Sequence, residues 1–197
     1  MDLDVFAHFS MGVATSILAS ASLAGAIRYI PLKKADAIIA WTTLAAGLFY
    51  FYVLSGFHFE WILSHWYLVA LENKQHYMID AIWIVIGGFA LWQRPSHYWS
   101  VILRSIAMGL IAFVLFFHVH DFSHAWWLEP YHRAISASLC VGIALYAIEL
   151  RSGKEWAAVG ASLALGAVGI MLMLYQAPGT AISCAPMLMD GLWMLMC

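Results

Sequence analysis

Charged residues are scarce in this sequence: only 10% of its 197 residues are Asp, Glu, Lys or Arg, whereas 64% are hydrophobic. A soluble domain of ordinary composition carries about 25% charged residues. A water-soluble fold of this size would therefore expose large apolar patches, which the lipid of a membrane accepts without cost. The low charge indicates an integral membrane protein, so membrane lipids are the first partner that the sequence predicts.

Basic runs and common catalytic motifs are also absent. The net charge is -2, and nucleic-acid binding depends on clustered Lys and Arg, so the composition excludes nucleic acid as a partner. The chain contains no GxGxxG, GxSxG or P-loop motif, and it therefore gives no sign of dinucleotide binding or serine hydrolase chemistry. The three cysteines form no CxxC pair, which indicates neither a disulfide framework nor a cysteine zinc site.

Long apolar stretches are abundant instead. Six of them are long enough to cross about 30 Å of hydrocarbon at about 1.5 Å per residue. They cover residues 5–27, 37–59, 77–93, 98–119, 132–150 and 156–175. Backbone groups in lipid must be satisfied within the chain, which favours helices. Because the connections are short, the sequence predicts an all-α transmembrane bundle forming one domain over residues 1–197.

Two further features concern the ends and the packing of the helices. A last apolar stretch at 182–196 is shorter, with Pro178 and Pro186 at its approach, so it is either a short seventh crossing or a re-entrant or interfacial segment. In the first stretch, small residues recur every four positions. They are Gly12, Ser16, Ser20 and Ala24. Such a stripe predicts that another helix approaches closely.

Lys and Arg concentrate at alternate connections between the apolar stretches. The residues that flank the first, third and fifth connections are Arg28, Lys33, Lys34, Arg94, Arg104, Arg151 and Lys154. Only Lys74 and Arg133 lie at the second and fourth connections. Because Lys and Arg are enriched in cytoplasmic loops, this asymmetry predicts an extracytoplasmic N-terminus.

Histidine is unevenly distributed in this topology. Of the nine histidines, only His97 falls on the cytoplasmic side. The others lie at or beyond the outer helix ends and are His8, His58, His65, His76, His118, His120, His124 and His132. Since they come from the N-terminal region and from two separate connections, residues distant in sequence could meet at one depth. Converging imidazoles are typical of a transition-metal site.

Spacing narrows the choice among these histidines. His120 and His124 share a face at i, i+4 if the helix continues, as the ligands of zinc-binding helices do. His76 and Asp80 have the same spacing, and a carboxylate in apolar surroundings needs a partner. A single interfacial histidine is ordinarily structural, so the hypothesis depends on number and spacing. The predicted metal site comprises His8, His76, Asp80, His118, His120, His124 and His132.

The identity of the metal is left open by the ligand types. Imidazole and carboxylate groups suit zinc, copper(II) or iron(II), and spacing does not choose among the three. Sulfur-containing residues crowd the stretch from Cys184 to Cys197 and would suit copper(I). Methionine is also common in apolar packing, which explains this stretch better.

The densest histidine segment resembles a known family. Phe117-His118-Val119-His120, followed by Leu128-Glu129 and His132, is similar to the FHxH and later Leu-acidic-His pattern of the transmembrane protein 45 group. The resemblance implies a multi-helix membrane fold with a histidine site, and the group has no well-established biochemical activity.

Other positions extend the resemblance to that group. Gln75-His76 before a Gly-rich helix, and His8 with Gly12 in the first helix, are similar in order and character. The resemblance covers much of residues 8–150, and it supports the fold and the site rather than an activity.

Three functions fit a membrane protein with converging histidines. The first is a metal-binding protein, either an enzyme whose metal activates water or oxygen towards a small or lipid-soluble substrate, with Asp80, Asp121 or Glu129 assisting, or a protein without catalysis. The second is an accessory subunit of a larger membrane metal-dependent oxidoreductase, with other integral membrane subunits as partners. The third is a b-type haem protein that grips haem between His58 and His118. The sequence favours the first and does not separate enzyme from subunit.

The predicted orientation can be tested with a membrane-impermeant thiol reagent on intact cells, after the three native cysteines are replaced by serine. A cysteine introduced at Ala125 should be labelled, because it lies in an outer connection. A cysteine introduced within 31–35 should be protected until the membrane is permeabilised, which is the control for reagent access. Labelling at 31–35 together with protection at 125 would reverse the topology.

Overall fold

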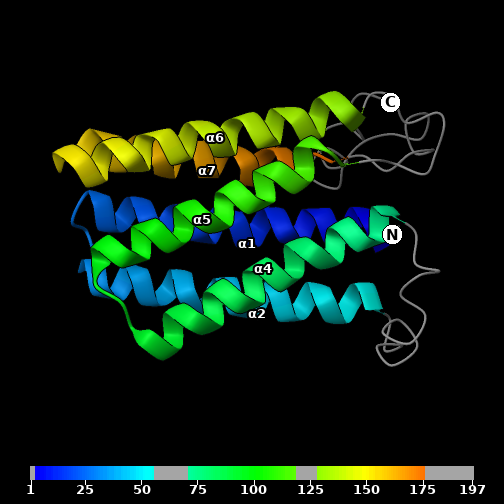
Figure 1. Ribbon diagram of the computed structural model, residues 1–197, viewed down its shortest axis with the longest axis horizontal. Coiled ribbons are helices and arrows are strands. Elements are labelled where there is room, and N and C mark those ends of the chain that lie inside the picture. Colours follow the sequence, from blue (N-terminus) through cyan, green and yellow to red (C-terminus); the bar gives the residue numbers. More distant parts are fainter. Residues whose placement is uncertain (1–2, 56–70, 119–127, 176–197) are drawn as a thin grey trace, which may run out of the picture.

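The described part of the chain folds into six long helices. A computed structural model describes residues 3–55, 71–118 and 128–175 (Figure 1). Its helices are α1 (Leu3–Ala26), α2 (Leu32–Ser55), α4 (Leu71–Gln93), α5 (His97–Phe116), α6 (Leu128–Ser152) and α7 (Glu155–Met173). Each corresponds to one predicted apolar stretch, and the described residues contain no strand, which confirms the all-α bundle. The stretch at 182–196 lies outside the described residues.

Proline residues mark where three of the helices begin. Pro31 directly precedes α2, and its carbonyl accepts the first backbone hydrogen bonds of that helix, from Lys34 and Ala35. Pro95 lies two residues before α5, and Pro130 occupies the first turn of α6. Proline is tolerated at these positions because the first backbone N–H groups of a helix have no intrahelical acceptor.

Five of the helices are long and apolar enough to cross a membrane: α1, α2, α5, α6 and α7. They support a multi-pass membrane protein. Helix α4 is less apolar because Lys74, His76 and Asp80 lie in its first half. It nevertheless runs the length of the bundle between α2 and α5 (Figure 1).

The helices form a closed ring. Each packs against its neighbours in the order α1, α2, α4, α5, α6 and α7, and the ring closes because α7 makes the most extensive contact of all with α1. Neighbouring helices run in opposite directions (Figure 1). The starts of α1, α4 and α6 therefore lie at the same end as the finishes of α2, α5 and α7.

Glycines permit the closest helix contacts in the ring. A Cβ at Gly12 of α1 would lie 2.6 Å from the carbonyl oxygen of Gly169 in α7, and a Cβ at Gly169 would lie 3.0 Å from the backbone nitrogen of Ser16. Small side chains let backbones approach in lipid. The predicted small-residue stripe is thus confirmed at Gly12 and Ser16, with α7 as the partner, whereas Ser20 is exposed.

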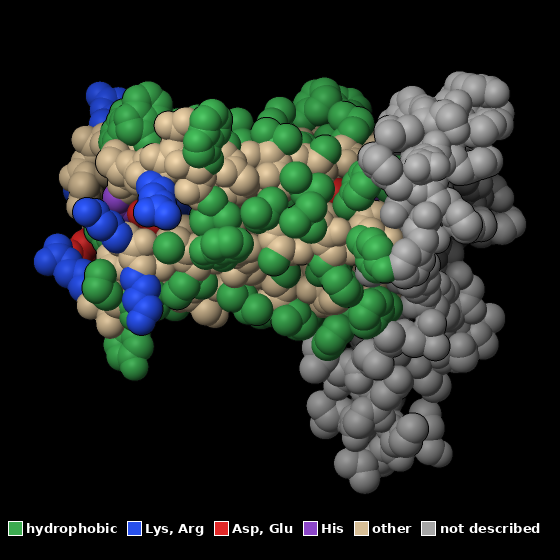
Figure 2. All heavy atoms as spheres, turned by 90° about the horizontal axis from the view of Figure 1, so that it is seen from below, with side chains coloured by type: hydrophobic (Ala, Val, Ile, Leu, Met, Phe, Trp, Pro, Cys, Tyr) green, Lys and Arg blue, Asp and Glu red, His purple; other side chains and the backbone are tan. Residues whose placement is uncertain are grey.

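Basic side chains gather at one end of the bundle, and hydrophobic side chains cover its sides (Figure 2). This end holds the short turns between α1 and α2, α4 and α5, and α6 and α7. Arg28, Arg94 and Gly153 adopt positive φ angles of 58°, 43° and 62° there, a conformation that commonly ends helices. Arg28 also pairs with Glu155 across two of the turns.

Two adjacent glycines of α4 provide a matched test of this packing. A Cβ at Gly87 would lie 2.5 Å from the backbone nitrogen of Leu44 in α2, whereas a Cβ at Gly88 would meet nothing within 4 Å. Gly87→Ala should therefore push the two helices apart and lower the free energy of unfolding by about 1–3 kcal/mol. Gly88→Ala should leave it unchanged or raise it by up to about 1 kcal/mol through better helix propensity.

Thermal unfolding of both purified variants in the same mild detergent measures the difference. Equal midpoints for Gly87→Ala and Gly88→Ala would contradict the close approach of α2 and α4.

Candidate functional site

Four histidines from separate segments meet inside one end of the ring. His8 lies on α1, His76 on α4, His118 directly after α5 and His132 on α6. The side chains of His8, His118 and His132 are buried, and His76 is half-buried. The antiparallel order of the helices explains their meeting, because it places the starts of α1, α4 and α6 beside the finish of α5.

The imidazole rings form a closed circuit of contacts. Ring centres lie 5.8 Å apart for His8 and His76, 4.9 Å for His76 and His118, 4.5 Å for His118 and His132, and 6.4 Å for His132 and His8. Imidazoles that bind one ion through nitrogens at about 2.0–2.1 Å have ring centres roughly 5 Å apart. The cluster therefore has about the size of a four-imidazole metal site.

The imidazole nitrogen atoms of these four histidines are not arranged as a set of metal ligands in this structure. Among the described residues, no group of three or more His, Cys, Asp or Glu side chains is arranged to hold a metal ion. The spacing of the rings and the direction of their nitrogens are separate properties, since a histidine ring turns about its bond to Cβ over a broad range of angles. Ligation would require such turns at several of the four rings.

Asp80 lies one helical turn after His76 and is 1% exposed. Neither of its carboxylate oxygens has a hydrogen-bond partner within the described part of the chain. A buried carboxylate without a partner is costly, and it favours either a bound proton or a nearby cation. The buried position agrees with the predicted need of this carboxylate for a partner.

Two residues outside the predicted ligand set brace the histidine cluster. Tyr175, just after α7, is buried and stacks on His8 with ring centres 3.6 Å apart. The Gln75 side chain donates a hydrogen bond of 2.8 Å to the carbonyl of Phe117, which joins α4 to the residue before His118. The sequence contained a signal for their proximity to the histidines, because both residues lie at predicted outer helix ends.

Tyr131 adds a further brace at this end. Its hydroxyl donates a hydrogen bond to the carbonyl of Met171, near the end of α7. That carbonyl also accepts a hydrogen bond from the backbone N–H of Leu174, so the tyrosine adds a second donor to it. The contact ties α6, which carries His132, to α7.

The remaining predicted ligands, His120 and His124, lie outside the described residues, as do His58, His65 and Asp121. His120 follows His118 by two positions, so its part in the site stays a prediction. The C-terminal sulfur-containing residues also lie outside.

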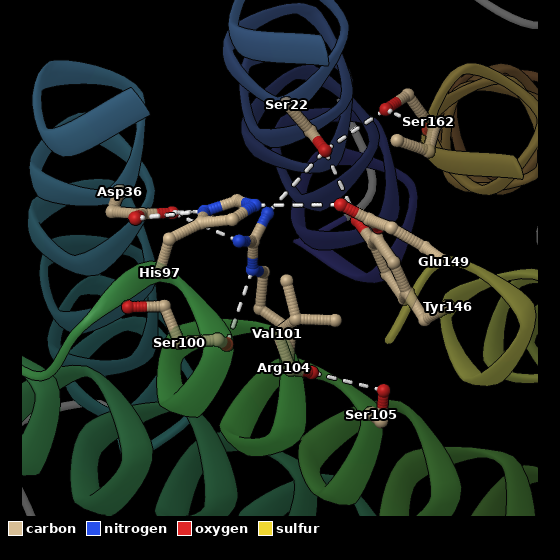
Figure 3. Close-up of polar contacts among 11 residues, drawn as sticks. Ser22, Asp36, His97, Ser100, Val101, Arg104, Ser105, Tyr146, Glu149 and Ser162 are labelled. Atoms are coloured by element: carbon tan, nitrogen blue, oxygen red, sulfur yellow. Dashed lines mark hydrogen bonds and ion pairs between the residues drawn. The ribbon is translucent and has the colours of Figure 1, made fainter. Parts of the chain in front are cut away.

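A second polar cluster occupies the opposite, basic end of the ring (Figure 3). Arg104 of α5 donates a hydrogen bond of 2.8 Å to the carboxylate of Asp36 in α2. His97 lies 3.1 Å from Asp36 through Nδ1 and 3.4 Å from Glu149 of α6 through Nε2. The side chains of Arg104 and Asp36 are only 13% and 12% exposed, so this ion pair is largely removed from solvent.

Hydroxyl groups extend this second cluster to α1 and α7. Ser22 accepts a hydrogen bond from Arg104 at 3.4 Å and from Ser162 at 2.9 Å, and it lies 3.0 Å from the Tyr146 hydroxyl. The Arg104 guanidinium also lies over the Tyr146 ring, 5.4 Å from its centre. Five helices are joined in this way. From its sequence position, Arg104 was expected only to flank the connection between two helices. The structure places it inside the bundle.

A cavity of about 90 Å³ lies within the ring, between the two polar clusters. All six helices contribute to its wall. His8, His76 and His132 line one end, and Ser22, Arg104 and Tyr146 line the other. The wall between them is almost entirely apolar, with Leu, Ile, Met and Val side chains predominating.

No protein-family model, curated protein or solved structure matches this chain. The functional argument therefore depends on the geometry of the histidine cluster, the basic end and the cavity.

The buried ion pair at the basic end should contribute strongly to stability. Asp36→Leu or Arg104→Leu alone leaves one charge inside the bundle, which should lower the free energy of unfolding by about 3–5 kcal/mol. The double variant removes both charges and should be more stable than either single variant. Thermal unfolding in detergent checks this order, and a double variant whose loss equals the sum of the two single losses would contradict direct pairing.

Proposed function

We propose that this chain is an integral membrane metal-binding protein whose site is formed by His8, His76, His118 and His132. The observation that carries the proposal is the closed circuit of four imidazole rings, whose centres lie 4.5–6.4 Å apart. These residues come from four separate segments, so neither chance spacing along one helix nor a surface belt of histidines explains their meeting.

The chemistry of the surroundings supports a cation at this position. Three of the rings are buried, and neutral imidazole is the commonest metal ligand in proteins. Asp80 adds a buried carboxylate one helical turn from His76, and a carboxylate near imidazole ligands offsets the charge of a metal and orients ligands. Imidazole ligands with a carboxylate suit zinc, copper or iron.

The contacts favour a single ion over a haem group. Ring centres 4.9 and 4.5 Å apart put His76, His118 and His132 in direct contact. A bis-histidine haem needs the macrocycle between its two axial rings, and these three rings leave no space for one between them. The predicted haem pair of His58 and His118 stays untested, because His58 lies outside the described residues. If the chain is instead an accessory subunit of a larger complex, no particular arrangement of this cluster is expected. Purification together with native partners distinguishes such a subunit from a metalloprotein that acts alone.

The orientation belongs to the same proposal. The basic turns lie at the end opposite the histidine cluster. Because Lys and Arg are enriched on the cytoplasmic side of membrane proteins, we propose that the cluster lies on the extracytoplasmic side. The protein would then take up its metal from outside the cytoplasm.

The metal content of purified variants tests the site. His76→Ala, His118→Ala and His132→Ala should each lower metal affinity by at least about tenfold, the typical effect of losing a ligand or a group that orients one. His8→Ala should act in the same direction, and His120→Ala tests the ligand outside the described residues. Elemental analysis after reloading with zinc, copper or iron at neutral pH measures the change.

His97→Ala is the matched control, because it removes a histidine from the opposite end of the same bundle. It should leave metal content unchanged while lowering thermal stability, since it breaks contacts to Asp36 and Glu149. Equal metal content in all these variants, or a folded parent protein that cannot be loaded with any of the three metals, would overturn the proposal.

A further inference from the structure

The cavity inside the ring is long and narrow. On α1 its lining residues run from His8 to Ser22, and on α6 from His132 to Tyr146. In both helices the two residues are fourteen positions apart, which is about 21 Å along a helix. A volume of about 90 Å³ spread over this length is room for roughly six to nine water-sized groups. They would lie in single file, so the shape excludes a bulky ring system and admits an unbranched chain.

The side chains that line the cavity determine which kind of molecule can bind in it. Between the polar ends, the lining is made of apolar side chains such as Leu18, Ile79, Ile111, Leu139 and Leu165. Apolar cavities remain dry and bind apolar molecules. A row of methylene groups would gain favourable burial along the whole wall.

The basic end is already occupied by groups of the protein itself. Arg104 donates to the Ser100 carbonyl, to Ser22 and to Asp36. The carboxylates of Asp36 and Glu149 lie beside it. Arg104 and His97 face the carboxylates of Asp36 and Glu149, so the charged groups of this end are already paired with one another. A head group would have to displace these contacts in order to bind here.

The histidine end has the opposite character. Its imidazoles, and the metal of the proposed function, bind oxygen-containing groups. A chain with a polar head would therefore lie with that head among His8, His76 and His132 and with its tail directed towards Arg104.

We propose that the cavity binds a single-chain amphiphile, with an unbranched alkyl tail along the axis of the ring and an oxygen-containing head at the histidine cluster. The position of the head rests on the proposed metal site, whereas the tail site rests on the cavity alone. The substrate class of the protein is thereby a fatty acid, a fatty alcohol or a related straight-chain lipid.

Binding of straight-chain carboxylic acids tests this proposal. The full chain is reconstituted in a membrane or in a detergent with a rigid steroid tail, so that detergent alkyl chains do not compete. Saturable binding of acids from butanoic to hexadecanoic acid is then measured. Affinity should rise with chain length and level off once the cavity is filled, and a branched acid of equal carbon number should bind at least about tenfold more weakly, the effect of two methylene groups left unburied.

Two substitutions that narrow the cavity at different distances from the histidine cluster make the test more specific. Thr15 lies seven residues from His8 along α1, and Ala107 lies only three residues from Arg104 along α5; both line the cavity. Ala107→Phe should weaken binding of the longest acids by at least about tenfold and leave the short ones unchanged. Thr15→Leu should move the limit to still shorter acids.

Ala144→Phe is the control, since Ala144 is exposed on the outside of α6 and the change should leave all affinities unchanged. Thermal unfolding identifies the variants that remain folded, and Thr15→Leu carries the test if Ala107→Phe does not fold. No saturable binding, or a folded cavity variant with the length dependence of the parent, would overturn the inference.

Metal content measured on the same samples separates this inference from the proposed function. A protein that binds metal but no acid overturns the lipid site alone. A protein that binds acids with the expected length dependence but takes up no metal supports the tail site and overturns the metal site.

Discussion

The contact that closes the ring is the backbone approach of α1 and α7 at Gly12 and Gly169, where a single added Cβ would meet the carbonyl of the facing helix. Without it, α1 would be the edge of an open row of helices. Closure gives the bundle an interior that lipid does not reach, and it brings His8 against Tyr175 at the end of α7. Both the histidine cluster and the cavity therefore depend on two residues that have no side chain.

The buried carboxylates inside this ring lie at its two ends, and their surroundings differ. At the basic end, Arg104 pairs with Asp36, His97 lies between Asp36 and Glu149, and serine and tyrosine hydroxyls join the network. Only one oxygen of the Glu149 carboxylate has no hydrogen-bond partner among the described residues there. At the histidine end, the Asp80 carboxylate finds no partner among the described residues. In an apolar medium such a difference matters, because a paired cluster stabilises the fold whereas an unpaired carboxylate favours binding of a proton or cation.

Much of the fold could be predicted from the sequence because transmembrane length and the satisfaction of backbone groups leave few alternatives. The meeting of His76, His118 and His132 followed from short connections and antiparallel neighbours. The position of His8 could not be fixed in the same way, since it depends on closure of the ring by helices far apart in sequence. The pairing of Asp36 with Arg104 was missed for a similar reason: an arginine near a helix end is ordinarily interfacial, and only the tertiary structure shows that it points inward.

Helix α4 shows that hydropathy alone is a poor guide to membrane crossing for a helix that faces the interior of a closed ring. Its first half carries His76 and Asp80, which lowers its hydropathy. Among the six described helices, it is the one that is not apolar enough to count as a membrane crossing by length and composition. Yet Asp80 is almost fully buried, and His76 faces the cavity rather than the outside of the bundle. A helix whose polar side chains face a protected interior need not be uniformly apolar to lie in a membrane. The property that weakens α4 as a crossing is therefore the same property that supplies the interior with imidazole and carboxylate groups.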